Sequence, residues 1–469
     1  MMTQAVHDRL MFAMRSLAGD LKVLSSMSET MAKIVSSIGF LFLFDGVRVR
    51  GVIMAKIVAS NGEFGDEFGY SASMDGDYAV IGAPYDSVGG NYSQGSAYIF
   101  LRSGTSWNQQ VMLTASDGAT NDLFGRSVSI SGDYALIGAG FDDIGGNSQQ
   151  GSAYVFMRSG SAWTQQAMLT ASDGMSGDHF GNSVSIDGDY ALAGAIYDDI
   201  YQGSAYIFLR NGTDWSQQAL LVAADGATND QFGCSASLSG DYALIGAYLD
   251  DISDTDQGSA YIFLRSDTSW SQQAKLTASD GASDDNFGWS VAIDGDYAVI
   301  GSYGKDVSGN SEQGAAYVFM RAGTDWNQQA MLTASDGSDY DEFGSSVSLS
   351  GDYALIGAYL DDVALPDQGS AYIFMRSGSD WDEQTQLSLS NGVSHNYFGF
   401  STTLDGEYAM IGANGYYLDQ GAAYTYCWAN QTWADCNGYM DDDDDDDGSM
   451  MIGGVSILGL SLISLMMMM

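Results

Sequence analysis

The chain has 469 residues and carries 60 Asp and Glu against 16 Lys and Arg, so its formal net charge is −44. Phosphate binding depends on Lys and Arg side chains, and this balance therefore argues against a nucleic acid as a partner. A strongly acidic surface instead fits a soluble protein outside the cytoplasm.

Residues 1–51 form a basic N-terminal segment. Within it, Met31-Ala32-Lys33 precedes the largely apolar run Ile34–Phe44, which has the layout of a signal peptide but no clear cleavage site. Residues 31–44 therefore predict either a signal sequence, with the true start at Met31, or an uncleaved anchor in a chain that starts at Met1.

The next part of the chain is an array of seven blocks of roughly 55 residues, a repeat length that indicates a recurring supersecondary unit. Each block begins with a Phe-Gly pair, has a second glycine 14 residues after that Phe, and has a Trp 12 residues after a Gln-Gly pair. Only the stretch between the second glycine and the Gln-Gly pair varies in length, as expected of a tolerant surface loop. The Phe residues are Phe68, Phe124, Phe180, Phe232, Phe287, Phe343 and Phe398.

Each block is predicted to form four β-strands. In the second block these are residues 127–130, 134–139, 151–158 and 166–171, and the first two are joined by a Ser-Gly-Asp turn. The third strand is apolar on both faces, so the sheet must be covered on both sides. Four-stranded antiparallel units of this kind pack as blades round an axis, and we predict an all-β, seven-bladed β-propeller.

The two ends of the array indicate how the ring closes. The last block has no fourth strand after Trp433, whereas residues 55–60 nearly repeat residues 274–279, the fourth strand of an inner block. We therefore predict a propeller domain over residues 52–439, closed by an N-terminal strand within residues 52–60. The inner strand should follow Phe-Gly, and the Phe should wedge between blades.

Phe-Gly, Ile-Gly-Ala and Gln-Gly-Ser-Ala-Tyr, at these spacings, resemble the FG-GAP repeats of the integrin α-chain propeller and of many surface proteins. The resemblance implies a non-catalytic cell-surface or secreted binding and adhesion module that recognises an extracellular protein or glycan. Some integrin blades hold calcium in the turn between the first two strands. Here that turn is only Asp75–Asp77 or Ser239–Asp241, which is too short, so that calcium site should not be transferred.

The acidic residues concentrate in two loops that a meander places at the same end of the strands, and we call this end the acidic rim. The blade-to-blade loops contribute Asp117 and Asp122 and their counterparts. Such oxygen ligands suit Ca²⁺, and a repulsive surface that maintains solubility is the alternative. The predicted ligand-binding residues of the rim are Asp142, Asp143, Asp198, Asp199, Asp250, Asp251, Asp361 and Asp362, and the predicted calcium ligands are Asp142, Asp143, Asp250, Asp251, Asp361 and Asp362.

Cys427 and Cys436 flank the turn of the last block, which predicts a local disulfide in an oxidising compartment. Cys234 follows a Phe-Gly pair and is expected to be a buried small residue. Asn91, Asn211 and Asn430 begin glycosylation sequons.

Residues 440–469 combine a spacer of seven aspartates with an uncharged tail from Met450. A tail of this length fits either a single membrane span or the signal for a lipid anchor. We therefore expect an extracellular protein attached to a membrane by its C-terminal tail.

No catalytic constellation stands out. His7, His179 and His395 are the only histidines, they lie in different segments, and the blades differ too little to nominate a site at the channel mouth. The favoured function is non-catalytic binding. The alternatives are an extracellular polymer-degrading hydrolase or lyase with a carboxylate and cation site on the rim, and a structural coat protein.

Overall fold

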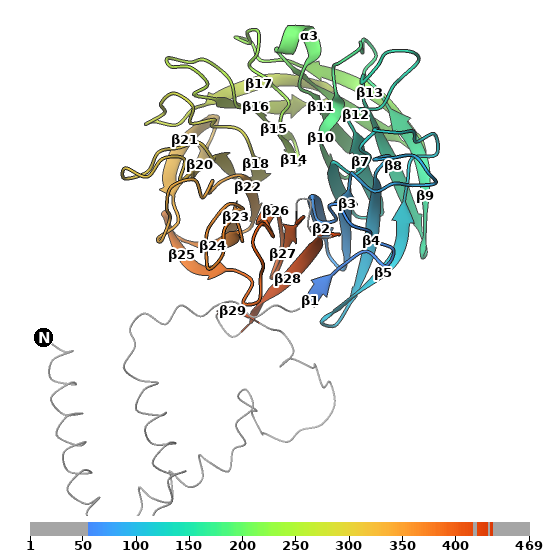
Figure 1. Ribbon diagram of the computed structural model, residues 1–469. Helices are drawn as coiled ribbons and strands as arrows, with labels where there is room; N and C mark the ends of the chain where they lie inside the picture. Colours follow the sequence, from blue (N-terminus) through green and yellow to red (C-terminus); the bar gives the residue numbers. More distant parts are fainter. Residues whose placement is uncertain (1–54, 416–419, 430–431, 435–469) are drawn as a thin grey trace, which may run out of the picture. The chain divides into compact units, whose positions relative to one another are not determined.

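A computed structural model describes residues 55–415, 420–429 and 432–434. They form seven antiparallel sheets arranged as blades round a central channel, which confirms the predicted all-β, seven-bladed propeller (Figure 1). The signal or anchor segment 31–44, the tail from residue 440, Cys436 and Asn430 lie outside the described residues.

The strands recur at four positions in the blades. The first strands are β2 (Ser71–Asp75), β6 (Ser127–Ser131), β10 (Phe180–Asp187), β14 (Ala236–Ser239), β18 (Val291–Asp294), β22 (Ser346–Ser350) and β26 (Phe398–Asp405). The second strands are β3 (Tyr78–Ala83), β7 (Tyr134–Ala139), β11 (Tyr190–Ala195), β15 (Tyr242–Ala247), β19 (Tyr297–Ser302), β23 (Tyr353–Ala358) and β27 (Tyr408–Ala413). The third strands are β4 (Ser96–Ser103), β8 (Ser152–Ser159), β12 (Ser204–Asn211), β16 (Ser259–Ser266), β20 (Ala315–Ala322), β24 (Ser370–Ser377) and β28 (Ala422–Ala429). The fourth strands are β5 (Ser106–Leu113), β9 (Ala162–Leu169), β13 (Asp214–Leu221), β17 (Ser269–Leu276), β21 (Asp325–Leu332) and β25 (Asp380–Leu387), and the remaining elements are β1 (Ala55–Ile57), β29 (Thr432–Ala434) and the short helix α3 (Asp198–Tyr201).

The fourth strand lies earlier in the chain than predicted. In the second blade, β9 begins at Ala162 and includes Trp163, whereas the sequence suggested a start at residue 166. The reason is the pairing of Trp163 with Arg158, which extends the β8–β9 hairpin almost to its turn, and a bulge after Val155 then shifts the register.

The Phe of each Phe-Gly pair lies between two blades, as predicted. Phe124 packs with Ile99 of the first blade and with Ile137 and Phe156 of the second, and its exposed fraction is 0%. Its backbone N–H donates to Gln94 O of the preceding blade at 2.9 Å. The hydrophobic core is thus divided into layers that each join two neighbouring blades.

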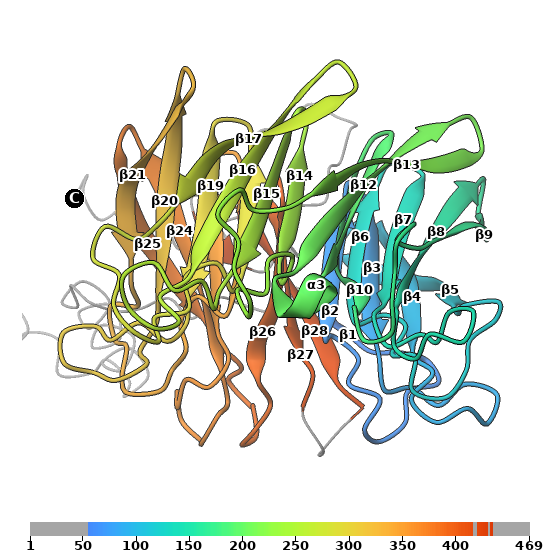
Figure 2. The same cartoon turned by 90° about the horizontal axis from the view of Figure 1, so that it is seen from above.

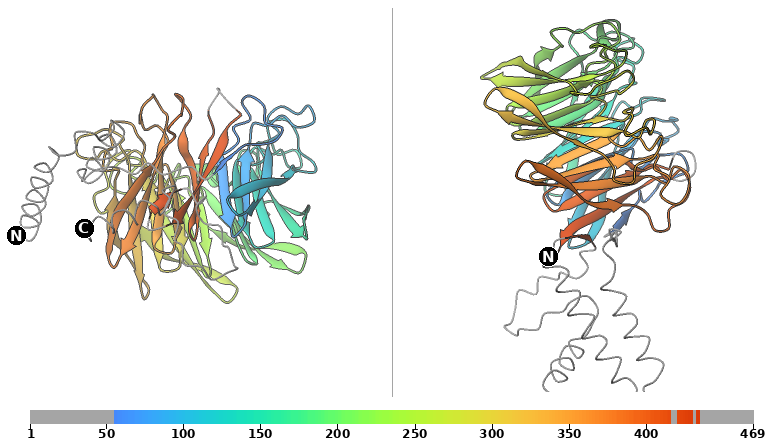
Figure 3. Two further views of the ribbon diagram at one scale, coloured as in Figure 1. Left: turned by 90° about the horizontal axis from the view of Figure 1, so that it is seen from below. Right: turned by 90° about the vertical axis from the view of Figure 1, so that its left-hand side faces the viewer.

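The inner strands surround the channel, as predicted, and a ring of side-chain hydrogen bonds joins them. Ser71 Oγ donates to Gly125 O of the next blade at 2.8 Å, and the equivalent serines repeat this bond round the ring. Ser401 donates to Gly69 O at 2.8 Å and so links the seventh blade to the first. Figure 3 shows the neighbouring blades side by side.

The outer edge of the seventh blade is composite. Strand β28 pairs with β29 at Cys427–Ala429 and with β1 at Ala423–Thr425. Ile57 of β1 is 3% exposed and packs against Met410 and Ala423 of the seventh blade. Two short strands therefore lie where the other blades have one long fourth strand.

Six arginines, each the last residue but one of its third strand, have a structural role. Arg102 pairs with Asp77 of its own blade at 2.6 Å, and its guanidinium lies 3.8 Å from the ring centroid of Tyr408 in the preceding blade. Arg158, Arg210, Arg265, Arg321 and Arg376 make equivalent ion pairs and ring contacts.

Candidate functional site

The two acidic loops meet at one end of the strands, as the meander requires. Figure 2 shows α3 and the neighbouring loops between second and third strands at the end opposite to the tips of the β12–β13 and β16–β17 hairpins. The loops that join one blade to the next reach the same end, because each connects an outermost strand to the inner strand of the next blade. In the first six blades, where the structure describes both loops in full, the two loops lie together at the rim end.

In the second blade the rim carboxylates converge on one tyrosine. The Tyr154 hydroxyl lies 2.8 Å from Asp142 Oδ2 and 3.1 Å from Asp117 Oδ1. Ser152 Oγ also donates to Asp142 Oδ2 at 2.6 Å. A hydroxyl carries a single hydrogen, so Tyr154 can satisfy only one of its two carboxylates at a time.

The predicted acidic pairs of the second, fourth and sixth blades each have one buried and one exposed aspartate, and the two accept hydrogen bonds from different kinds of donor. Asp142, Asp250 and Asp361 are between 6% and 9% exposed, and each accepts hydrogen bonds from a Ser and a Tyr of its own third strand. Their exposed neighbours accept from backbone N–H groups later in the loop, as Asp143 does from Gln149 at 2.8 Å. The counterparts of Asp143 are Asp251 and Asp362, which bind the N–H groups of Asp256 and Asp367.

In the third blade, the predicted pair Asp198 and Asp199 begins α3. Asp198 Oδ2 accepts from the Tyr206 hydroxyl at 2.9 Å, so it occupies the same structural position as Asp142. Asp199 has a φ of 46°, a left-handed conformation that the shorter loop of this blade imposes.

Two blades carry a built-in ammonium group among these carboxylates. Lys275 Nζ lies 2.6 Å from Asp225 and 2.7 Å from Asp250 in the fourth blade. In the fifth blade Lys305 replaces the first aspartate of the loop, and its Nζ lies 3.0 Å from Asp285 Oδ2. Among the residues that the structure describes, Asp142 has no Lys or Arg partner.

Crowding and burial raise the pKa of the carboxyl groups beside these pairs. The pKa of Asp122 is raised to about 6, chiefly by burial, with Asp142, Asp143 and Asp117 adding to the shift and the Ala119 N–H opposing it. Burial likewise raises the pKa of Asp341 to about 7, with Asp361 and Asp336 adding to the effect. Burial and the neighbouring carboxylates thus favour the protonated form of Asp122 and Asp341.

The described part of the chain contains no preformed cluster of three or more His, Cys, Asp or Glu side chains with the geometry of a metal site. Nor does it contain a helix long and apolar enough to cross a membrane.

The predicted modification sites have different surroundings. Asn91 Nδ2 donates to Gln94 Oε1 at 2.9 Å and to Gly118 O at 3.0 Å, the same bonds that Asn147 makes without a sequon. Asn91 therefore has a role in loop structure, whereas Asn211 is exposed at the end of β12. Cys427 is disulfide-bonded, and burial raises the pKa of the Cys234 thiol to about 11.

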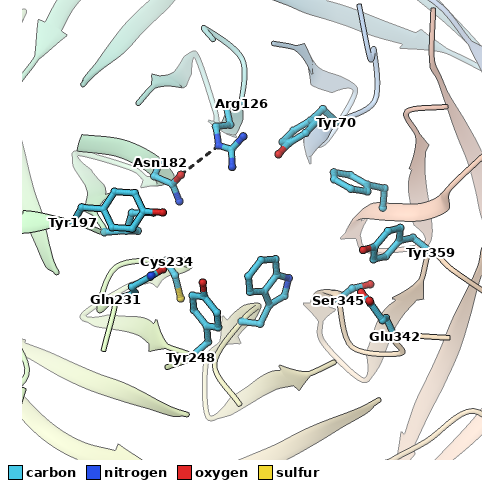
Figure 4. A pocket seen from close by; sticks show the side chains of 13 residues that line it. Tyr70, Arg126, Asn182, Tyr197, Gln231, Cys234, Tyr248, Glu342, Ser345 and Tyr359 are labelled. Atoms are coloured by element: carbon cyan, nitrogen blue, oxygen red, sulfur yellow. Dashed lines mark hydrogen bonds between the residues drawn. The ribbon is translucent and has the colours of Figure 1, made fainter. Parts of the chain in front are cut away.

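The prediction that the blades are too alike to mark the channel mouth is wrong. The residue after each Phe-Gly pair differs in all seven blades, and all seven line one pocket at the rim end of the channel (Figure 4). An alignment of the seven blocks shows this variation, because the positions on either side barely change. The residues are Tyr70, Arg126, Asn182, Cys234, Trp289, Ser345 and Phe400.

The seven repeated blades define a repeat protein of the β-propeller class, and comparison with protein families identifies the repeat. The FG-GAP repeat matches residues 52–100, 107–156, 163–208, 215–263, 270–319, 326–374 and 381–426. The chain belongs to the FG-GAP repeat family, and its propeller resembles the N-terminal propeller of integrin α-chains. Comparison with curated proteins found no match.

Proposed function

We propose that the protein is a non-catalytic binding and adhesion module of the cell surface, which recognises an extracellular protein or glycan through its acidic rim. The observation that carries the proposal is that both acidic loops of neighbouring blades meet at one end of an FG-GAP propeller, as Asp117 and Asp142 do at Tyr154. FG-GAP propeller domains are typically non-catalytic. Such a face suits a partner that is bridged by cations.

We further propose that Ca²⁺ occupies the rim at the carboxylates that no lysine neutralises. Asp142 with Asp143, and Asp361 with Asp362, are the leading ligands, whereas Asp250 with Asp251 already faces Lys275. Backbone carbonyls and water would complete the coordination, because Ca²⁺ takes about 6 to 8 oxygen ligands and no full cluster of side chains is preformed among the described residues. Lys275 supports the proposal, since it shows that this position in the fold accommodates a positive charge.

Without Ca²⁺, we expect the protein to be less stable at pH 8 than at pH 5.5. Carboxyl groups such as Asp122 and Asp341 have a raised pKa in the folded state, so the folded chain binds their protons more tightly than the unfolded chain does. This contribution to stability is complete below the unfolded value near 4 and is lost as the pH rises through about 6 to 7. Millimolar Ca²⁺ should restore the melting temperature at pH 8 by binding only the folded state.

The variant Met168→Lys tests whether a positive charge stabilises the rim of the second blade. Met168 of β9 is paired with Tyr154 of β8, just as Lys275 of β17 is paired with Tyr261 of β16. The variant should be more stable than wild type at pH 8 without Ca²⁺ and should gain less from Ca²⁺. Thr164→Lys adds the same charge to an exposed site near the hairpin turn and serves as the control. If calorimetry detects no Ca²⁺ binding to the wild-type protein, the calcium proposal is wrong and the acidic rim serves only to keep the protein soluble.

We also propose that the propeller is displayed outside the cell and held to a membrane by the tail that follows residue 440. The uncharged terminus, the acidic spacer and the exposed sequon at Asn211 support this location. After expression of the full chain in a eukaryotic host, the protein should fractionate with membranes and carry a glycan on Asn211. Release by a phosphoinositide-specific lipase would select the lipid anchor, and unglycosylated protein in the cytosol would refute the proposal.

A further inference from the structure

The pocket at the channel mouth contains an arginine unlike the others. The structure describes seven arginines, and six of them pair with aspartates at the hairpin end of their blades. Arg126 makes no ion pair within the described residues, although the chain has 60 acidic side chains. In so acidic a protein, an unpaired guanidinium at the end of the channel is a distinctive feature.

The guanidinium of Arg126 is held in place by uncharged neighbours. It lies 5.4 Å from the ring centroid of Tyr70 and 5.7 Å from that of Phe141, and its Nε donates to Asn182 Oδ1 at 3.3 Å. This contact uses the inner nitrogen, so the two terminal nitrogens remain for a ligand, and Figure 4 shows the group pointing into the pocket. A planar fork of N–H donors fits a carboxylate.

The remaining walls provide aromatic faces and dispersed polar groups. Trp289 is 39% exposed, and Tyr248 and Tyr303 hold its indole in edge-to-face contact at centroid distances of 4.8 and 4.9 Å. Gln231 and Ser345 add hydrogen-bonding groups on different sides. The pocket has a volume of about 340 Å³, at the small end of the range of about 300 to 1,000 Å³ for ligand sites.

The nearby carboxyl groups do not exclude an anion. Burial raises the pKa of Glu342 to about 7, with Glu312 and Asp367 adding to the effect and a hydrogen bond with Tyr359 opposing it. Burial also raises the pKa of Glu67 to about 7, against the opposing effects of Asn414 and Arg126. Both groups are therefore partly protonated near neutral pH and can donate hydrogen bonds. The outer rim still repels long polyanions, so the site favours a ligand with one carboxylate.

We propose that this pocket binds a single sugar unit that carries a carboxylate, such as a terminal uronate of a glycan. The carboxylate lies on Arg126, the apolar C–H face of the pyranose ring packs on Trp289, and Asn182, Gln231 and Ser345 bind hydroxyl groups. A sugar ring carries hydroxyl groups on several sides and can therefore bind polar side chains on several walls of the pocket. A simple fatty or aromatic acid has no such hydroxyl groups. The inference rests on the proposed function as a surface binding module but does not require calcium at the rim.

The test is a titration of the full chain with methyl β-glucuronide, with methyl β-glucoside and choline as competing probes, followed by calorimetry and ligand-observed NMR. Wild type should bind the glucuronide and should bind the glucoside at least about 10-fold more weakly, since a charge-assisted hydrogen bond is lost. Arg126→Gln should lower the affinity for the glucuronide by a similar factor and abolish the preference. Arg210→Gln, at the hairpin end, should bind as wild type does.

Trp289→Ala is a second variant, used if Arg126→Gln folds poorly. It removes a partly exposed side chain and should also weaken binding of the glucuronide. Equal binding of glucoside and glucuronide, preferential binding of choline, or unaltered binding by Arg126→Gln would each overturn the proposal. The titration is repeated with a calcium chelator. If the glucuronide still binds and Ca²⁺ does not bind the rim, the proposal for the pocket stands and the proposal for calcium fails.

Discussion

Deletion of residues 52–60 should lower the free energy of unfolding by more than any single surface substitution. The deletion removes β1 and the residues that follow it, including Ile57 and Ala59, which are 3% and 5% exposed in the layer between the seventh and first blades. Loss of a buried Ile side chain alone costs about 2 to 5 kcal/mol, and the deletion also exposes half of the outer edge of β28. Thermal and denaturant unfolding of the propeller would measure the loss.

Two point variants separate the side chains of β1 from its backbone. Ile57→Ala should destabilise by about 2 to 5 kcal/mol, whereas Lys56→Ala, at an exposed position of the same strand, should have little effect. The seventh and first blades remain joined by Ser401 and by the contact of Arg102 with Tyr408, so we expect a weakened ring rather than an unfolded chain. A deletion variant as stable as wild type would rule out strand closure by this segment.

The sequence predicted the features that seven copies repeat. Phe124 and its counterparts could be placed between blades because a large apolar residue before a glycine recurs at a fixed spacing, and the meander fixed which loops share an end. The sequence did not reveal that the Asp142 carboxylate accepts hydrogen bonds from Ser152 and Tyr154. Those bonds depend on distances between side chains, which the sequence pattern does not specify.

The channel mouth was missed for the opposite reason. Its residues are informative because they differ between blades, as Arg126 and Trp289 do, and positions that differ are not part of a repeated pattern. Loop conformations such as α3 also escaped prediction, since the left-handed φ angles of Asp199 and Ile200 follow from a short connection rather than from a local propensity. In a repeat protein, the repeated positions specify the scaffold and the variable ones indicate its site.

Substitution of the second glycine of a block should be among the most damaging single changes in the protein. A Cβ added to Gly82 would lie 1.9 Å from the carbonyl oxygen of Gly125 in the next blade, and the equivalent glycines have the same contact. The neighbour is backbone held by the Ser71 hydrogen bond, so it cannot rotate away as a side chain would. We expect Gly82→Ala to destabilise by at least about 4 kcal/mol, at the far end of the range for point variants.

Two further glycines of the first blade distinguish close contact from backbone strain. Gly104, in the β4–β5 turn, has a φ of +61° and open space round its missing Cβ, so Gly104→Ala should cost only the left-handed backbone penalty of about 1 to 2 kcal/mol. Gly95 has a φ of +84° and its added Cβ would lie 2.1 Å from Phe124 O, so Gly95→Ala should combine both effects. Chemical denaturation gives the three values. If Gly82→Ala costs no more than Gly104→Ala, the blades do not pack through these glycines as closely as the structure indicates, whereas the expected order would explain why each block keeps glycine 14 residues after its Phe.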